Sequence, residues 1–271
     1  MYKLYKGKKM KYKTYLKNKN LSKITINTYL RQKDNWKKYL NDRKPNKKIF
    51  VSYINKYTNN YSPNTTKLVY ASVLSFLKFE KRWKLYSECK DIRLPSIIQV
   101  YKITITIDEY NNMKKNIKQL NWYQERDWLI FSFLFSTGIR INEINQINKK
   151  KINNGKMKII GKGSKTRNIY ISNNLENLLN NWKFNKINIS KKNKFISNKQ
   201  INIIIKKIGL EYFKKNISSH SLRRSYATNL LRKKVDIKTV SMLMGHSNIN
   251  TTSKYIYFTD DEIKKNIEGI F

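Results

Sequence analysis

Cysteine, long apolar runs and acidic residues are all scarce in this chain, and each shortage excludes a class of protein. Cys89 is the only cysteine among 271 residues, so the chain can form neither an internal disulfide nor a cage of cysteine ligands around a metal. No apolar run approaches the roughly 18 residues that a membrane-spanning helix needs. The basic N-terminal residues contain no apolar block, so we expect no signal peptide and a location in a reducing cytosol.

Acidic residues number 17 against 58 lysines and arginines, which gives a formal net charge of +41. Repulsion among so many positive charges opposes compaction of the chain. A polyanionic partner is the simplest explanation of such a charge. Nucleic acid is the first candidate and an anionic membrane surface is the second. The alternative is a solvated lysine surface that reflects an AT-rich genome. Because 39% of the residues are hydrophobic and 13% are aromatic, the chain can bury a core and is no disordered polycation.

Proline and glycine are also rare, at 3 and 8 residues, and their positions mark the organisation of the chain. Before residue 90 the apolar side chains recur at helical spacing, and we find no solenoid repeat. A strongly apolar helix is expected to end at Phe79, after a turn at Ser62-Pro63 and with Asn64 or Thr65 as its N-cap. We expect residues 1–92 to form an all-helical domain, with further helices at 8–18, 24–40 and 48–57.

Residues 91–110 break this helical pattern. Pro95 disfavours helix immediately before it, and the β-branched residues that follow favour an extended chain. We therefore expect a linker at 93–105 and a second domain at 106–271, which begins with a helix near Thr106.

The second domain has a mixed pattern, so the predicted fold class is mainly α with a small β-hairpin. The segment 125–138 is apolar on nearly every side, which indicates a buried central helix ended by Gly138. Two β-prone runs around a glycine-rich turn predict a hairpin at 157–172. Helices are also expected at 219–234 and at 236–245, the second capped by Asp236 and closed by Gly245.

Polar side chains at three places in this domain are candidates for chemistry. Arg140 follows the buried helix directly, and it is either a structural arginine paired with Glu143 or a functional guanidinium oriented by that carboxylate. His220 precedes Arg223 by three positions, so both lie on one helix face, where they suit an oxyanion or a phosphate. The basic turn around Lys165 is either a phosphate-binding loop or a solvated hairpin tip, and its spacing is not that of a P-loop.

Taken together, these positions resemble those of the tyrosine recombinase, or phage integrase, family over nearly the whole chain. The segment STGIRINEI resembles the family's first-arginine box, and GKGSKTR resembles its lysine hairpin. HSLRRSYATNLL resembles the HxxR box and MGHSNINTTSKY the final box, and these two motifs are specific. YLKNKNLSKITINTYLRQ resembles the opening of the family's core-binding domain. The matching residues, in order, are Arg140, Glu143, Lys165, His220, Arg223, His246 and Tyr255.

The resemblance implies how these residues would cut DNA. Tyr255 would attack the scissile phosphate and form a 3′-phosphotyrosyl bond. Arg140 and Arg223 would hold the non-bridging oxygens and offset the developing charge. Lys165, at the tip of its hairpin, would protonate the departing 5′-oxygen.

The remaining matched residues would assist. His220 would help to move a proton to or from the tyrosine, because its ordinary pKa is near neutral. His246 would bond a phosphate oxygen, and Glu143 would orient the arginines and histidines without reacting. Such a reaction needs no metal, ATP or other cofactor, since the covalent link stores the bond until a 5′-hydroxyl reverses it.

The family further implies an assembly. The partners would be double-stranded DNA with specific recombination sites and three more copies of the chain, in a homotetramer that passes through a Holliday junction. A C-terminal helix at about 259–271 would dock on a neighbouring subunit. The protein would act in the cytoplasm on the nucleoid, or in a host cytoplasm if a mobile element or virus encodes it.

Three alternatives stay open. Ser253-Lys254-x-x-Tyr257 faintly resembles the nucleophile segment of type IB topoisomerases, so Tyr257 competes with Tyr255. The chain as a whole could be such a topoisomerase, which relaxes supercoils. It could also be an inactive DNA-binding descendant that serves as an architectural protein.

Overall fold

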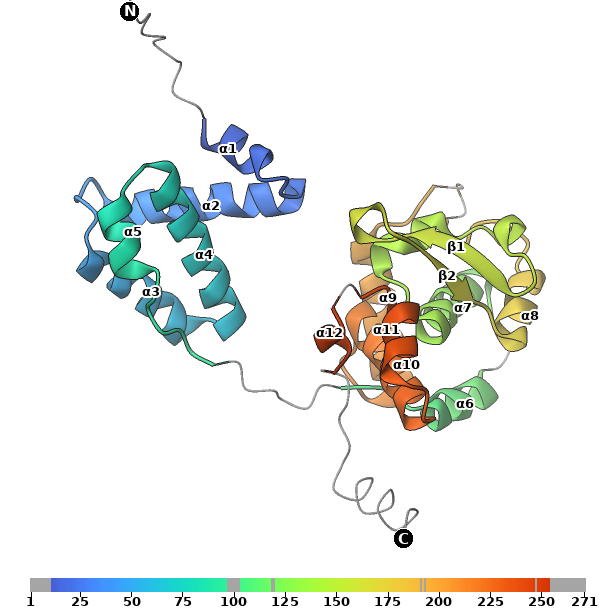
Figure 1. Ribbon diagram of the computed structural model, residues 1–271. Helices are drawn as coiled ribbons and strands as arrows, with labels where there is room; N and C mark the ends of the chain where they lie inside the picture. The colour runs from blue at the N-terminus through green and yellow to red at the C-terminus, as the bar shows by residue number, and fades with distance from the viewer. Residues whose placement is uncertain are drawn as a thin grey trace, which may run out of the picture. The chain divides into compact units, whose positions relative to one another are not determined.

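The computed structural model describes residues 11–96, 103–117, 120–190, 192, 194–246 and 248–253 (Figure 1). The chain divides into two compact units, Met1–Val100 and Tyr101–Phe271. Within the described ranges, helices and one two-stranded antiparallel sheet make up the regular structure, which confirms the predicted fold class. None of the helices in those ranges is both long and apolar enough to cross a membrane.

The first unit is a helical bundle, as the apolar spacing predicts. Its core includes Trp36, Phe50 and Leu77, which are almost fully buried, and its second and fourth helices pack against each other. A hydroxyl or amide oxygen caps the second, third and fourth helices by accepting a hydrogen bond from a backbone N–H of the first turn. The helices are α1 (Tyr12–Asn18), α2 (Lys23–Leu40), α3 (Lys47–Asn60), α4 (Pro63–Phe79) and α5 (Trp83–Cys89).

The start of α4 corrects one expectation. The N-cap is Ser62, whose hydroxyl accepts from the Thr65 N–H at 3.3 Å, and neither Asn64 nor Thr65 caps the helix. Pro63 is the first helical residue. Its fixed φ suits that position and its missing N–H costs nothing there, so the helix begins one residue after the serine.

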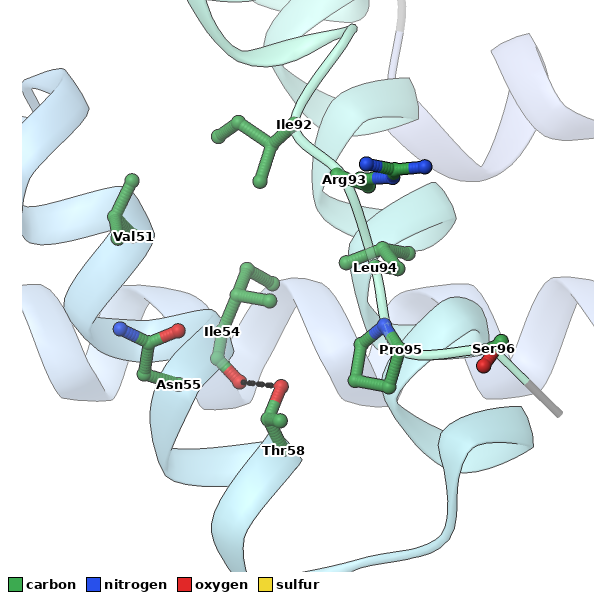
Figure 2. Close-up of a pocket in the computed structure, with 9 residues that line it drawn as sticks. All are labelled: Val51, Ile54, Asn55, Thr58, Ile92, Arg93, Leu94, Pro95 and Ser96. Atoms are coloured by element: carbon green, nitrogen blue, oxygen red, sulfur yellow. Dashed lines mark hydrogen bonds between the residues drawn. The ribbon is translucent and has the colours of Figure 1, made fainter. Parts of the chain in front are cut away.

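A pocket in the first unit lies between α3 and the segment that follows α5 (Figure 2). Val51, Ile54 and Thr58 line it from α3, and residues 92–96 line it from the other side. Because Ile92 and Leu94 pack against the core of this unit, the packed chain continues past residue 92, where we expected the domain to end.

The second unit is built around one central helix, α7, which packs against α8, α9 and α10 (Figure 1). Its elements are α6 (Ile107–Asn116), α7 (Trp122–Thr137), η1 (Ile141–Gln146), η2 (Lys149–Lys151), β1 (Lys156–Ile160), η3 (Lys162–Ser164), β2 (Thr166–Tyr170), α8 (Asn173–Asn181), α9 (Asn198–Phe213), α10 (Ser219–Arg232), α11 (Ile237–Met244) and α12 (Asn250–Ser253).

The central helix confirms the expectation of a buried helix ended by Gly138. Asn121 and Gln124 form a capping box, so the helix starts earlier than predicted, at Trp122. Every residue from Trp128 to Phe135 is buried. Gly138 closes the helix with a left-handed φ of 59°. A side chain there would also collide with its surroundings, because a Cβ would lie 2.3 Å from Cδ1 of Tyr226 on α10.

The predicted hairpin is present as the antiparallel pair β1 and β2, in a register that sets Ile160 opposite Thr166. Met157 and Ile159 of β1 are buried together with Ile169 of β2, so one face of the hairpin packs on the core. The side chain of Gln146 in η1 both accepts from the Ile160 N–H and donates to the Ile160 carbonyl, each at 2.8 Å. The hairpin is thereby held against η1.

The last residues of the expected linker, 93–105, pack in the second unit. The Ile105 N–H donates to Ser225 Oγ at 2.8 Å, and the Asn229 side chain donates to the Ile105 carbonyl at 2.9 Å. Ile105 is completely buried. The end of the segment 93–105 is therefore part of this unit, and α6 begins directly after it at the capping box of Thr106 and Glu109.

Candidate active site

The site begins where α7 ends. Gly138 reverses the chain direction, and Arg140 follows as the residue before η1. The Arg140 N–H donates to Oε2 of Glu143 at 2.8 Å, while its guanidinium donates to Oε1 at 3.3 Å. One carboxylate therefore fixes both the backbone and the side chain of Arg140. The side chain of Glu143 is 4% exposed and that of Arg140 is 29% exposed, so the arginine reaches the surface from a buried anchor.

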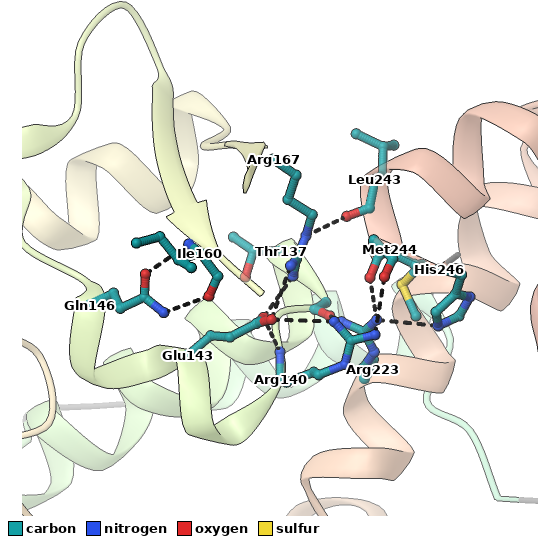
Figure 3. A network of polar contacts seen from close by, with 12 residues as sticks. Thr137, Arg140, Glu143, Gln146, Ile160, Arg167, Arg223, Leu243, Met244 and His246 are labelled. Carbon is teal, nitrogen blue, oxygen red and sulfur yellow. Dashed lines mark hydrogen bonds and ion pairs between the residues drawn. The ribbon is translucent and has the colours of Figure 1, made fainter. Parts of the chain in front are cut away.

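A second arginine, Arg167 of β2, holds the same carboxylate (Figure 3). Its two terminal nitrogens donate to the two oxygens of Glu143 at 3.0 and 2.7 Å. This two-point geometry is the strongest form of an arginine–carboxylate contact. Burial alone would raise the pKa of Glu143, but the hydrogen bonds and charges of Arg167 and Arg140 outweigh it and hold that pKa below its ordinary value. Glu143 therefore stays ionised.

The third arginine, Arg223 of α10, is buried and donates to two main-chain carbonyls. One belongs to Gly138, at the end of α7, and the other to Met244, at the end of α11. Arg223 thus joins the ends of two helices that are distant in sequence. Its Nη2 also lies 3.3 Å from Nε2 of His246, which brings the predicted second arginine and second histidine together.

The C-terminal end of α11 is the point on which all three arginines converge (Figure 3). Three successive carbonyls each accept from a different guanidinium. Leu243 accepts from Arg167 Nε at 3.1 Å, Met244 accepts from Arg223, and Gly245 accepts from Arg140 Nη2 at 3.2 Å. A helix leaves its last carbonyls without intrahelical partners, and this end of its dipole favours cations.

Gly245 permits this convergence. It closes α11 in a left-handed conformation with φ of 62°, as the sequence predicts, and a Cβ at this position would lie 2.9 Å from Cδ of Arg167. Asp236 caps the start of the same helix, also as predicted. The helix is therefore fixed at both ends, with its C-terminal carbonyls facing the arginines.

The electrostatics of the cluster favour an anion. The cluster holds three guanidinium groups and one ionised carboxylate, so it has an excess of positive charge. Burial, followed by the charges of Arg223, Arg140 and Arg167, lowers the pKa of His246 to about 4. The imidazole is therefore neutral at neutral pH and does not add to that charge. Planar, always-charged guanidiniums held in fixed directions match the oxygens of a phosphate.

The other predicted site residues are not drawn into this network. His220 is exposed on α10, and the polar contacts of the cluster do not reach it. Lys165 is exposed in the hairpin turn, where only its carbonyl takes part in a hydrogen bond among the described residues, accepting from the Gly161 N–H at 2.8 Å. Tyr255, its competitor Tyr257 and the predicted helix at 259–271 lie outside the described residues.

Sequence reasoning missed Arg167, although a signal was present. The alternation of β2 puts Arg167 on the same face as the buried Ile169, and an arginine at an inward strand position needs a buried partner. Sequence reasoning also missed the carbonyls of α11. Every residue has a main-chain carbonyl, so the residue type does not indicate which carbonyl accepts a hydrogen bond.

A model of the phage integrase family matches residues 104–262 of the chain. The chain belongs to this family, the tyrosine recombinases. Members break and rejoin DNA strands, so the protein is an enzyme of that class. Two relatives and one solved structure illustrate the match.

Tyrosine recombinase XerC of Caldanaerobacter subterraneus is 29% identical over 234 residues, which cover 80% of this chain and 65% of that protein. Tyrosine recombinase XerD of Staphylococcus epidermidis is 27% identical over 281 residues, which cover 91% of this chain and 92% of that protein. A solved lambda integrase tetramer bound to a Holliday junction has a similar fold, with a TM-score of 0.71 and 16% identity over 92% of this chain and 77% of that one.

Proposed function

We propose that this tyrosine recombinase is site-specific and that it cuts and rejoins DNA through a 3′-phosphotyrosyl intermediate at Tyr255 and a Holliday junction. The observation that carries the proposal is the convergence of Arg140, Arg167 and Arg223 on three successive carbonyls of α11. A cluster with excess positive charge, held by these hydrogen bonds and next to the chain that leads to Tyr255, suits the transition state of phosphoryl transfer.

Arg140 and Arg223 have the direct roles in this proposal. A phosphodiester is anionic, and attack by a tyrosine adds charge to its non-bridging oxygens. Arg140 follows the end of α7, Arg223 lies within α10, and each donates to a main-chain carbonyl at the end of α11, so they can hold two oxygens without rearrangement. The side chain of Arg167 is buried against Glu143, and we assign it to holding that carboxylate.

The proton transfers fall to groups on more accessible elements. His220 is exposed one helical turn before Arg223, where it can assist removal of the Tyr255 proton. Lys165 is exposed in the hairpin turn, where it can protonate the 5′-oxygen that leaves. The phosphotyrosyl bond then conserves the energy of the broken phosphodiester, and a 5′-hydroxyl reverses the attack.

The rest of the molecule would serve DNA binding and assembly. We assign the first, all-helical unit to the core-binding role, so that both basic units contact the duplex. The fold that the chain shares with the lambda integrase tetramer on a Holliday junction supports a homotetramer. In that assembly residues 259–271 would dock on a neighbouring subunit and couple the position of Tyr255 to assembly.

Covalent trapping on suicide DNA tests the proposal. The protein is incubated with a pool of random duplexes, each nicked so that the 5′-hydroxyl fragment diffuses away after cleavage. Complexes that survive denaturant are recovered and their DNA is sequenced. We expect adducts enriched in one sequence, and recombination between two duplexes that carry it. Adducts without sequence preference, together with relaxation of any supercoiled plasmid, would indicate a type IB topoisomerase. DNA binding without adducts would indicate an architectural protein.

A further inference from the structure

Thr252 of α12 contacts the ring of His246, which borders the arginine cluster. Its side chain is completely buried, and its Oγ1 lies 2.8 Å from Nδ1 of His246. The opposite ring nitrogen, Nε2, lies 3.3 Å from Nη2 of Arg223. The imidazole is therefore held at both nitrogens, by a hydroxyl on one side and a guanidinium on the other.

These two partners differ in what they can do. A guanidinium only donates hydrogen bonds, whereas a hydroxyl both donates and accepts. Because Nε2 faces a group that only donates, this contact is a hydrogen bond only when Nε2 carries a lone pair. A neutral ring then carries its proton on Nδ1 and donates it to Thr252. The lowered pKa of His246 supports a neutral ring at neutral pH.

The proposed function requires the opposite arrangement when DNA is bound. A phosphate oxygen accepts hydrogen bonds, so His246 can contact it through Nε2 only if Nε2 carries the proton. In a neutral ring this means that Nδ1 gives up its proton to water and Nε2 takes one up. Nδ1 then carries a lone pair and needs a donor. Rotation of the Thr252 hydroxyl supplies that donor without moving any heavy atom.

We propose that Thr252 is a positioning residue of the active site, whose hydroxyl lets the neutral ring of His246 switch from accepting at Nε2 in the free protein to donating there in the DNA complex. The hydroxyl achieves this because it can reverse the direction of its hydrogen bond. The inference rests on the proposed function for its second half only, since the proton position in the free protein can be measured without DNA.

The sequence supplies unusually clean controls. Thr251 is the neighbour of Thr252 on α12 but is exposed, so Thr251→Val makes the same chemical change away from the ring. Thr252→Val keeps the shape of the side chain and removes the hydroxyl. Thr252→Ser removes a methyl group and keeps the hydroxyl. A purely structural role would make Thr252→Ser the more harmful change, because the buried methyl is then what matters.

The first measurement is the ¹⁵N NMR spectrum of the ring nitrogens in the DNA-free protein at neutral pH. The chain has 2 histidines, so the spectrum of a His220→Asn variant assigns the signals of His246. We expect a neutral ring with the proton on Nδ1 in the wild type, in Thr251→Val and in Thr252→Ser. In Thr252→Val the Nδ1 proton loses its acceptor, so the Nδ1 signal should move from its wild-type position. Unchanged shifts in Thr252→Val, or a proton on Nε2 or on both nitrogens in the wild type, would overturn the inference.

The second measurement is the rate of adduct formation on the trapped DNA, together with DNA affinity. We expect Thr252→Val to slow the rate about tenfold, the equivalent of one net hydrogen bond, with unchanged affinity. Thr252→Ser and Thr251→Val should react within about twofold of wild type, well inside that difference. Equal loss in Thr252→Ser and Thr252→Val contradicts a role for the hydroxyl. Absence of any adduct in the wild type would instead refute the proposed function, and the NMR result would stand by itself.

Discussion

At the scale of single residues, the buried carboxylate of Glu143 decides how the site is held. It accepts hydrogen bonds from both Arg140 and Arg167, and those residues come from different elements. One negative charge therefore fixes two positive side chains whose mutual repulsion would otherwise separate them. The loss of one partner should change how much the remaining contacts contribute to stability, since contacts within one network are not additive.

Replacement of Arg167 by glutamine tests this coupling. The change leaves a buried carboxylate with one arginine fewer, and breaking a buried ion pair from one side costs about 3–5 kcal/mol. Chemical denaturation of the second unit should show a loss of that size. The exposed neighbour change Lys158→Gln should stay within about 0.5 kcal/mol of wild type. In Glu143→Gln/Arg167→Gln the loss should be smaller than the sum of the single losses, and strict additivity would contradict the coupling.

The depressed pKa of His246 predicts a dependence of stability on pH. A histidine in an unfolded chain titrates near about 6.5, whereas in the folded protein the pKa is about 4. Between these values the unfolded state binds more protons, so this contribution is complete above about 6.5 and is lost as the pH falls toward about 4. Water screens this half-buried group, so we expect a loss of about 1–2 kcal/mol.

Denaturation of wild type and of His246→Gln at pH values from 7 to 4.5 measures this loss. The wild type should lose more stability than the variant across that range, because glutamine does not titrate. If the two curves of stability against pH are parallel, His246 has the same pKa in the folded and unfolded states. The burial and the arginine charges would then not lower that pKa.

At the scale of elements, two helix ends and one hairpin build the site, and glycines make the close approach possible. Gly138 and Gly163 both have left-handed φ values, 59° and 73°. They differ in the room available for a side chain. A Cβ on Gly138 would meet the Tyr226 ring, whereas a Cβ on Gly163 would meet nothing within 4 Å.

Alanine at these two glycines separates backbone strain from steric overlap. Gly163→Ala should cost about 1 kcal/mol, the backbone strain alone. Gly138→Ala should cost about 2–4 kcal/mol, since overpacking adds to that strain. Denaturation midpoints of the second unit provide the comparison. Equal losses would mean that the Tyr226 ring moves away freely and does not constrain the end of α7.

The hairpin is the element that supplies the proposed general acid. Lys165→Ala should slow cleavage of ordinary DNA by roughly 10²–10⁴-fold, the contribution of a positioned proton donor. A substrate with a 5′-bridging sulfur leaves without that proton, so it should restore most of the rate to the variant. Single-turnover cleavage of both substrates measures the rescue. If Lys162→Ala is the variant that the sulfur rescues, the role belongs to Lys162.

The elements that the sequence predicts well are those with local signals. Neighbouring residues alone determine the apolar run of α7 and the cap at Asp236. The same holds for the glycines that end α7 and α11. The expected cap of α4, Asn64 or Thr65, is wrong because Ser62-Pro63 fits a turn before the helix as well as it fits a cap followed by the first helical residue. The 3₁₀ segment η1 and the inward side chain of Arg167 depend on contacts between distant segments, which composition and spacing do not contain.

At the scale of the whole molecule, the net charge of +41 indicates a polyanionic partner, and family membership identifies it as DNA. Charge alone goes no further, because contacts to phosphates carry no sequence information. The target sequence therefore has to come from the trapped duplexes. The position of the covalent bond, in contrast, is a claim about one atom of this chain.

The most direct test of that claim is peptide mapping of the trapped complex. After digestion of protein and DNA, mass spectrometry locates the tyrosine that carries a 3′-phosphonucleotide. We predict that it is Tyr255, that Tyr255→Phe binds the same duplex but forms no adduct, and that Tyr257→Phe still reacts. A nucleotide on Tyr257, or an adduct that persists in Tyr255→Phe, would contradict the account.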